Sequence, residues 1–167
     1  MGTTPILDRQ LAVLRAITPH ILIVGGDPLR GQGAGVPVVR DRVTGAGALG
    51  GLYTALAEAP TEQVLVIACD MPFLTAPFLS ALAARGAGLD ALVPRDARGP
   101  HPLCASYSRR IAPHLDACIA AGRLRVVEAV EGVGVHYFEA DELARFDADG
   151  RLLFNVNTPE DYARARH

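Results

Sequence analysis

Two carboxylates that each follow a run of apolar residues are the side chains best placed for chemistry. Asp70 ends the run Val64–Cys69, and Asp41 follows the strand-like segment Val36–Arg40. In an open parallel sheet, ligands bind beyond the carboxyl ends of the strands. Mg²⁺ takes one or two protein carboxylates and completes its shell with water and phosphate oxygens. Asp70 is therefore a candidate magnesium ligand and Asp41 a weaker one, with a turn or cap residue as the alternative for each.

A glycine-rich segment precedes an expected helix. The segment Gly45–Gly50 matches GxGxxG, and Asp70 lies twenty residues beyond its last glycine, which is close to the dinucleotide-binding fingerprint. In that fingerprint the first glycine ends the strand directly, whereas here Arg40–Thr44 intervenes, which weighs against an NAD-dependent oxidoreductase. In either case, small residues at a helix N-terminus let an anionic ligand approach the backbone amides.

Other polar residues give a weaker signal. The glycine-rich loop Gly26–Gly35 follows the first expected strand, and an ordinary surface loop is its simpler interpretation. Arg95 and Arg98 could reach phosphates after a strand end, and His101 could face a substrate. Solvated loop residues are the alternative for all three.

Composition excludes several classes of protein. The 167 residues are 50% hydrophobic, which indicates one folded domain, and a formal net charge of −2 offers no basic surface for nucleic acid. The apolar runs are too short to cross a bilayer and no leader opens the chain, so we expect a soluble cytoplasmic protein without a membrane partner. Cys69, Cys104 and Cys118 lack the paired spacing of a zinc or disulfide site and are expected to be reduced core residues.

Short apolar runs alternate with amphipathic helices, which predicts an α/β fold with a Rossmann-like, mostly parallel sheet between two helical layers. The expected helices are Pro5–Ile17, Leu49–Glu58, Ala76–Arg85, Arg109–Ala121 and Arg123–Val130. The expected strands are His20–Gly25, Val36–Arg40, Gln63–Cys69, Asp90–Pro94, His101–Tyr107, Gly134–Glu139 and Leu152–Phe154. A last helix begins near Thr158, where Asp161 is placed to complete a capping box.

Four segments, in this order and spacing, resemble the MobA-like nucleotidyltransferases, and specifically the molybdenum cofactor guanylyltransferase family. They are GAGALGGL at 45–52, VLVIACDMPF at 64–73, HPLCASY at 101–107 and FNVNTPEDY at 154–162. ACDMPF and NVNTPED are the most specific, and the similarity covers nearly the whole chain. Ala48 stands where the family usually has proline. The resemblance implies the three-layer α/β/α fold of the nucleotide-diphospho-sugar transferases.

This resemblance also implies an activity, which is transfer of GMP from GTP to the terminal phosphate of molybdopterin or the molybdenum cofactor. Pyrophosphate is released, Mg²⁺ is the cofactor, and apo-forms of molybdoenzymes are further implied partners. Asp70 corresponds to the family's magnesium aspartate and Asp41 to the aspartate before the glycine-rich helix. The implied binding residues are Gly47, Leu49, Gly50 and Gly51 beside the phosphates, and Asn155 and Asn157 in the pterin half.

One departure from the family pattern keeps alternatives open. Family members begin with a strand and a loop of the form LxGGxSxRMGxDK, whose lysine holds the nucleotide phosphates. Here Met1 and Gly2 lead directly into the first helix segment, and the sequence contains no lysine. We therefore expect residues 1–167 to form a single domain that lacks this strand and loop. A cytidylyltransferase and a catalytically silent pterin-binding protein remain the alternatives to guanylyl transfer.

Overall fold

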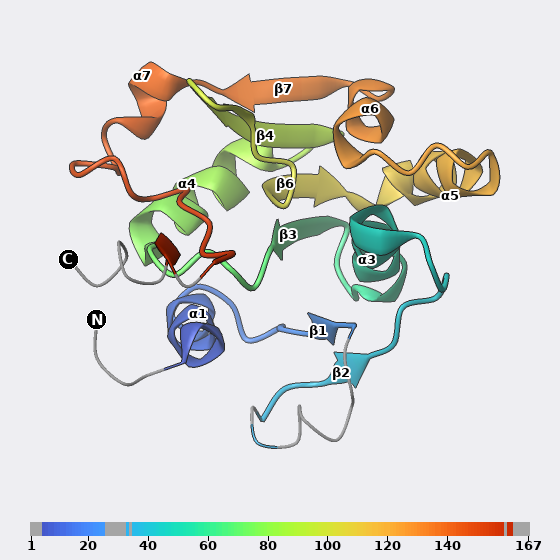
Figure 1. Ribbon diagram of the computed structural model, residues 1–167, viewed down its shortest axis with the longest axis horizontal. Coiled ribbons are helices and arrows are strands. Elements are labelled where there is room, and N and C mark those ends of the chain that lie inside the picture. Colours follow the sequence, from blue (N-terminus) through green and yellow to red (C-terminus); the bar gives the residue numbers. More distant parts are fainter. Residues whose placement is uncertain (1–4, 26–32, 34, 159, 162–167) are drawn as a thin grey trace.

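A row of four strands forms the centre of the molecule (Figure 1). In the computed structural model, which describes residues 5–25, 33, 35–158 and 160–161, these strands lie in the order β3-β6-β4-β7. Their bounds are β3 (Gln63–Ile67), β6 (Cys104–Ser108), β4 (Ala91–Asp96) and β7 (Val135–Phe138). β5 (Gly99–Pro100) forms a hairpin with the end of β4, and β1 (Ile23–Val24) pairs in parallel with β2 (Val38–Val39) as a separate ribbon.

The direction of β6 departs from the expected pattern. β6 runs antiparallel to both of its neighbours, whereas β7 is parallel to β4. Three of the four strands, β3, β4 and β7, thus run in one direction and β6 runs in the other, so the sheet is mixed, with most of its strands parallel in direction. An apolar run does not encode the direction of its strand, because a buried strand of either direction is apolar on both faces.

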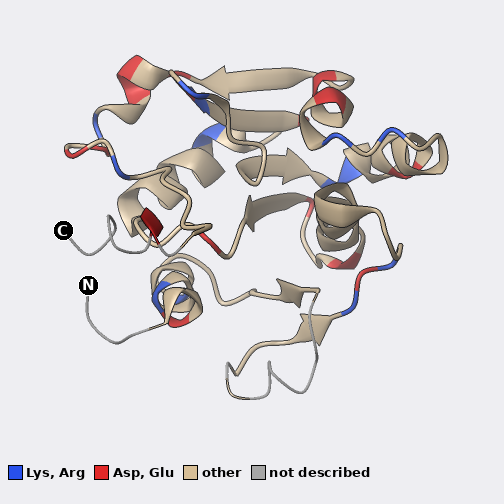
Figure 2. Ribbon diagram, in the orientation of Figure 1, with Lys and Arg blue, Asp and Glu red and all other residues tan. Residues whose placement is uncertain are grey.

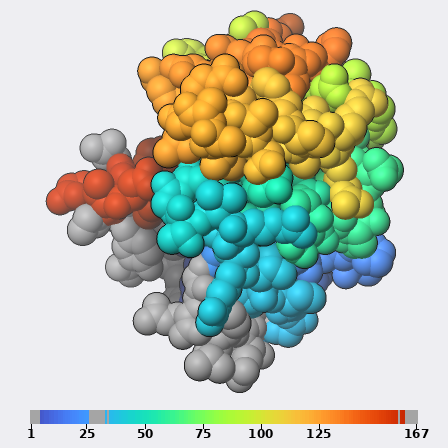
Figure 3. Space-filling model, turned by 90° about the vertical axis from the view of Figure 1, so that its right-hand side faces the viewer, coloured from blue at the N-terminus to red at the C-terminus, as the bar shows by residue number. Residues whose placement is uncertain are grey.

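Helices cover both faces of the sheet, as the sequence predicts. One apolar cluster joins the side chains of Val64 and Val66 to α3, α5 and α6, and a second joins Leu65 and Ile67 to α1, α4 and α7. This alternation follows the two-residue period of a strand. The helices are α1 (Ile6–Arg15), α3 (Gly47–Glu58), α4 (Ala76–Gly86), α5 (Ala112–Ala120), α6 (Val126–Glu131) and α7 (Ala140–Leu143), with the 3₁₀ turn η2 (Arg109–Ile111) before α5. Figure 3 shows α3 in cyan and teal against the yellow and orange segments that include α5 and α6.

The expected elements are present with shifted ends, apart from one error. The predicted strand Leu152–Phe154 is wrong, because this segment is a turn in which Phe154 N donates to Arg151 O at 3.0 Å. The carboxylate of Asp147 accepts hydrogen bonds from the amides of Arg151 and Leu152 at 2.7 and 2.8 Å and holds the turn. Leu152 and Leu153 are each 2% exposed, so the apolar pattern reflected burial rather than strand pairing.

The expected capping box is confirmed. Asp161 N donates to Thr158 Oγ1, and Thr158 N donates to Asp161 Oδ2, each at 3.1 Å. The rest of the expected helix lies outside the described residues. Short α7, which the sequence did not predict, begins with a capping box of its own between Glu139 and Glu142.

Charged residues lie mainly on the outer helices and loops (Figure 2). Strands β1, β2, β3, β6 and β7 carry none. Within the described ranges, no helix has both the length and the apolar character needed to cross a membrane.

Gly86, at the end of α4, provides a test of this packing. A Cβ at this position would lie 2.3 Å from Ser106 Oγ and 2.5 Å from Ser106 Cβ on β6. We expect Gly86→Ala to lower the free energy of unfolding by about 1–3 kcal/mol, because α4 must move off the sheet. The measurement is urea unfolding followed by circular dichroism. Gly33→Ala is the control, since its Cβ would meet no heavy atom of a described residue within 4 Å, and equal stability of the two variants would contradict the packing.

Candidate functional site

Among the described residues, one oxygen of the Asp70 carboxylate accepts a hydrogen bond and the other does not. Asn155 Nδ2 donates to Asp70 Oδ2 at 3.1 Å, joining residues 85 positions apart. Asp70 Oδ1 is buried and has no hydrogen-bond partner within the described part of the chain. A buried carboxylate oxygen without a donor is unfavourable. A cation would satisfy it, so this site fits the magnesium ligand that the sequence predicts.

Backbone contacts from both halves of the chain position the turn that carries Asp70. Gln10 Nε2, on α1, donates to Ala68 O at 2.8 Å and to Met71 O at 3.0 Å. From the other side, Val156 N donates to Asp70 O at 2.8 Å. Gln10 is 7% exposed, and the sequence analysis missed it. Its signal is a polar residue beside Leu11 on the buried face of an amphipathic helix.

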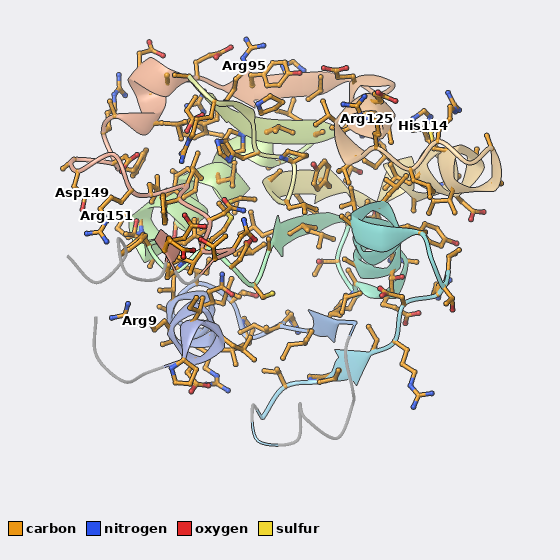
Figure 4. The ribbon with its side chains drawn as sticks, viewed as in Figure 1. Arg9, Arg95, His114, Arg125, Asp149 and Arg151 are labelled. Atoms are coloured by element: carbon orange, nitrogen blue, oxygen red, sulfur yellow. The ribbon has the colours of Figure 1, made fainter. Side chains whose placement is uncertain are left out.

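An aromatic pair with an arginine lies beside this turn. The rings of Phe73 and Phe154 have centroids 6.3 Å apart, and the guanidinium of Arg151 lies 4.1 Å from the centroid of Phe73. Figure 4 shows Arg151 at the left side of the view, just below Asp149 and away from Arg95 beside β7 and from His114 on α5. A positive charge therefore lies close to the Asp70 turn.

Asp41 lies in a second group, at the start of α3. It is exposed, and a Cβ at Gly25 or Gly51 would lie 3.5 or 3.8 Å from one of its carboxylate oxygens. The next residue, Arg42, donates its amide to Thr54 Oγ1 at 3.0 Å, and Thr54 Oγ1 donates to Gly50 O at 2.8 Å. Thr54 is fully buried. This threonine, which the sequence analysis also missed, holds the Asp41 segment against α3.

The N-terminus of α3 presents free amides. Its cap residue Ala46 makes no side-chain hydrogen bond, and the amides of Gly47, Ala48 and Leu49 have no acceptor among the residues that the structure describes. Gly47 and Ala48 are exposed, and Gly47 has a φ of 55°. Free amides and the helix dipole favour an anion at this position.

The predicted phosphate-loop residues have different structural roles. Leu49 is fully buried in the core, so its role there is packing. At Gly50 a Cβ would lie 2.9 Å from Ala46 Cβ and 3.2 Å from Val43 O, so packing requires glycine there. Gly51 faces Asp41, as described above. Most of the predicted glycine-rich loop 26–35 lies outside the described residues.

The two groups are separate centres in this structure. Within residues 5–25, 33, 35–158 and 160–161, no hydrogen bond or ion pair joins Asp41 to Asp70, and no cluster of three His, Cys, Asp or Glu side chains could hold a metal. Asn157 does not join Asp70 either. Its side chain is exposed, and its backbone N–H donates to Asp161 Oδ2 at 3.2 Å. A cation at Asp70 would therefore take few protein ligands, as Mg²⁺ commonly does.

The charged side chains of the β4–β5 hairpin form ion pairs within the protein. Arg95 forms an ion pair with Glu139, and its guanidinium lies over the ring of Tyr137 on β7. Arg98 Nη2 lies 2.6 Å from Asp96 Oδ2, and His101 Nε2 lies 3.1 Å from Asp96 Oδ1. Burial raises the pKa of Asp96, but the hydrogen bonds from Arg98 and the contact with His101 outweigh it and lower the pKa to about 2. These contacts support a structural role for Arg95, Arg98 and His101.

Comparison with known proteins places this geometry in a family. A profile of the MobA-like NTP transferase domain matches residues 1–134, which include β3, α3 and both carboxylates. The chain belongs to the MobA-like NTP transferase family. Membership in this nucleotidyltransferase family argues against the oxidoreductase alternative. The match ends before Asn155, so the profile does not cover the residue that holds Asp70.

Several MobA-like relatives are similar over most of the chain. A probable molybdenum cofactor guanylyltransferase from Pelotomaculum thermopropionicum is 31% identical over 99% of this chain and 81% of its own. One from Chloroflexus aggregans is 34% identical over 93% and 76%. Among solved structures, molybdopterin-guanine dinucleotide biosynthesis protein A from Archaeoglobus fulgidus has a TM-score of 0.77 at 29% identity, covering 94% of this chain and 83% of that chain.

The thiol next to Asp70 allows a chemical test of the site. The expectation of a buried core residue is wrong for Cys69, which is exposed, and correct for Cys104 and Cys118. Burial raises the pKa of Cys104 to about 12, and a thiol that stays protonated is a poor nucleophile. We expect iodoacetamide at pH 8 to alkylate Cys69 in the folded protein and the other two only after unfolding. Mass spectrometry of tryptic peptides measures this, and equal modification of the three would contradict the structure.

Proposed function

We propose that this protein transfers GMP from GTP to the terminal phosphate of molybdopterin or of its molybdenum form. An oxygen of the acceptor phosphate bonds to the α-phosphorus of GTP, and the bond from that phosphorus to the bridging oxygen breaks as pyrophosphate leaves. The acceptor phosphate is already an anion, so the reaction requires no strong base. Alignment and neutralisation of charge then carry the catalysis. Relatives named as guanylyltransferases support this proposal.

The observation that carries the proposal is the unpaired oxygen of Asp70. In the proposed enzyme Asp70 would hold Mg²⁺, and Asn155 restrains the carboxylate through Oδ2. A Mg²⁺ ion held there would supply neutralisation of negative charge on the phosphates. The Asp70 turn cannot shift easily, because Gln10 and Val156 hold its backbone from two sides. A carboxylate that is already fixed loses little conformational entropy when the nucleotide binds.

The N-terminus of α3 is the proposed phosphate-binding element. The free amides of the exposed Gly47 and Ala48 can each donate to a phosphate oxygen. Gly51 and the exposed Asp41 lie beside this helix start. Residues 1–167 contain no lysine, so this stretch offers the triphosphate backbone amides, arginines and neutral polar side chains as donors. Asn157 is assigned to the pterin half together with Asn155.

Substitution of Asp70 tests the proposed role in catalysis. Asp70→Asn keeps the size of the side chain and removes its charge, so we expect kcat/KM for GTP to fall by roughly a hundredfold or more. The assay follows pyrophosphate release and formation of the guanine dinucleotide with Mg²⁺, GTP and molybdopterin. Asp116→Asn, at an exposed position of α5, is the matched control and should keep full activity. Equal activity of both variants would overturn the assignment.

The same assay separates guanylyl from cytidylyl transfer. We expect GTP to be used in preference to CTP when the two compete at equal concentration. Preferential use of CTP would show that CTP, and not GTP, is the substrate. Pterin binding without any nucleotide transfer would show that the protein is a binding protein and not an enzyme.

The two asparagines provide a second, matched test. Asn155→Ala removes the hydrogen bond to Asp70 Oδ2, and we expect it to weaken Mn²⁺ binding by roughly 10–100-fold, as is typical for loss of a residue that orients a metal ligand. Asn157→Ala removes an exposed side chain from the same segment and should leave Mn²⁺ affinity unchanged. Electron paramagnetic resonance titration measures free Mn²⁺. If the two variants bind Mn²⁺ equally, the hydrogen bond does not orient the carboxylate.

A further inference from the structure

A small, mainly apolar recess lies beside α6 on the surface of the protein. α6 contributes Val127, Val130 and Glu131 to its walls, and β7 contributes Val135 and Tyr137. Two prolines between β4 and β6 also line it. Val130 is buried, whereas the other four named residues are partly or fully exposed. Apolar side chains that gather in one place at a surface are typical of a contact with another molecule.

Leu124 is an exposed apolar side chain next to this recess. It is 42% exposed, and Leu7 on α1, at 37%, is the other large apolar residue that is exposed in the described part of the chain. Leu124 lies in the loop between α5 and α6, seven residues before Glu131. Seven residues are about two turns of helix, or roughly 10 Å. The projecting leucine and the recess therefore belong to the same face of the molecule.

Backbone hydrogen bonds fix the loop that presents Leu124. Gly122 has a φ of 70°, in the left-handed region, and its N–H donates to Ile119 O at 2.9 Å. Arg123 N donates to Cys118 O, also at 2.9 Å. These two bonds and the left-handed glycine form the Schellman motif that ends many helices. A side chain on a fixed loop loses little conformational entropy on binding, so Leu124 is ready to dock.

The charges at the two ends of α6 have opposite sign. Arg123 and Arg125 precede the helix, Glu131 is its last residue, and all three are exposed. Figure 4 shows Arg125 beside α6. Arg125 Nη1 lies 2.9 Å from Glu128 Oε1, but these side chains are 82% and 54% exposed. An ion pair so exposed is weak, so Arg125 can also pair with a carboxylate of another molecule.

A two-fold symmetric pair of chains satisfies the recess, the leucine and the charges together. When Leu124 of one copy enters the recess of the other, symmetry places the second Leu124 in the first recess. Leu124 lies before the start of α6 and the recess extends to Glu131 at its end, so the two α6 helices must run antiparallel. Arg125 of each copy then lies next to Glu131 of the other. A net charge of −2 opposes such association only slightly.

We infer that this face is a dimer interface whose occupant is a second copy of the chain, with Leu124 of each copy in the recess of the other. The second copy is the partner that the page of contacts around α6 selects, because the leucine and the recess match in polarity and the arginines match Glu131 in charge. The inference rests on α6 and its surroundings and does not depend on the proposed function.

Sedimentation equilibrium of the protein over a wide range of concentration measures the association. We expect a monomer–dimer equilibrium with a Kd of roughly 1–100 μM, because an interface built around one recess is small. Leu124→Asp should raise this Kd by about tenfold or more, since it would place a charge in an apolar recess. Leu7→Asp, which changes the other exposed leucine, is the matched control and should leave the Kd unchanged.

Two charge reversals test the symmetry of the interface. Arg125→Glu places two glutamates side by side across the interface, and Glu131→Arg does the same with two arginines. We expect each variant alone to dimerise more weakly than the unchanged chain at low salt. An equal mixture of the two variants restores two contacts of opposite charge, so we expect it to form heterodimers. A small molecule or an unrelated protein in the recess would not produce this pattern.

Three results would contradict the inference. The protein could stay monomeric at every concentration. Leu124→Asp and Leu7→Asp could dimerise equally well, which would place the interface elsewhere. The mixture of charge-reversed variants could associate no better than each variant alone. Circular dichroism of each variant establishes that it is folded. Because the readout is sedimentation and not GMP transfer, failure here leaves the test of Asp70 unaffected.

Discussion

The hydrogen bond between Asn155 and Asp70 is the contact on which the candidate site depends. It fixes one carboxylate oxygen and leaves the other buried with no donor among the described residues, an arrangement that is unfavourable unless a ligand completes it. Contacts from distant parts of the chain converge on the same turn. Gln10 binds two of its carbonyls from α1, and Phe154 packs against Phe73. The fold therefore uses packing and hydrogen bonds to hold a charge in place.

The candidate site has opposite electrostatic character at its two elements. A full negative charge lies at the end of β3, and the partial positive charge of a helix N-terminus lies at the start of α3. The side chain of Thr54 anchors the second element, as Gln10 anchors the first. No hydrogen bond among the described residues joins either anchor to the other centre. In the proposed reaction the anionic nucleotide is the component that connects the two centres.

Local pattern was enough to predict the layers of the fold and the position of Asp70, because an apolar run ending in a carboxylate before Pro72 has few structural solutions. It could not predict Gln10, whose partners lie about sixty positions away in the sequence. Asn155 was found through the resemblance, which assigned it to the pterin half; its contact with Asp70 was visible only in three dimensions. The wrong strand at Leu152–Phe154 and the wrong prediction that Cys69 is buried have one cause. Apolar character indicates a tendency to be buried, but it does not show which neighbour covers a residue or whether any does.

The distance in sequence between Asn155 and Asp70 also has a kinetic consequence. Closing a loop of 85 residues is slow and entropically costly until the intervening strands have paired. During synthesis, α1 and β3 leave the ribosome long before the segment 154–156 does. The hydrogen bond to the Asp70 carboxylate therefore forms only after the C-terminal segment has been synthesised. The site reaches its final geometry as one of the last events of folding.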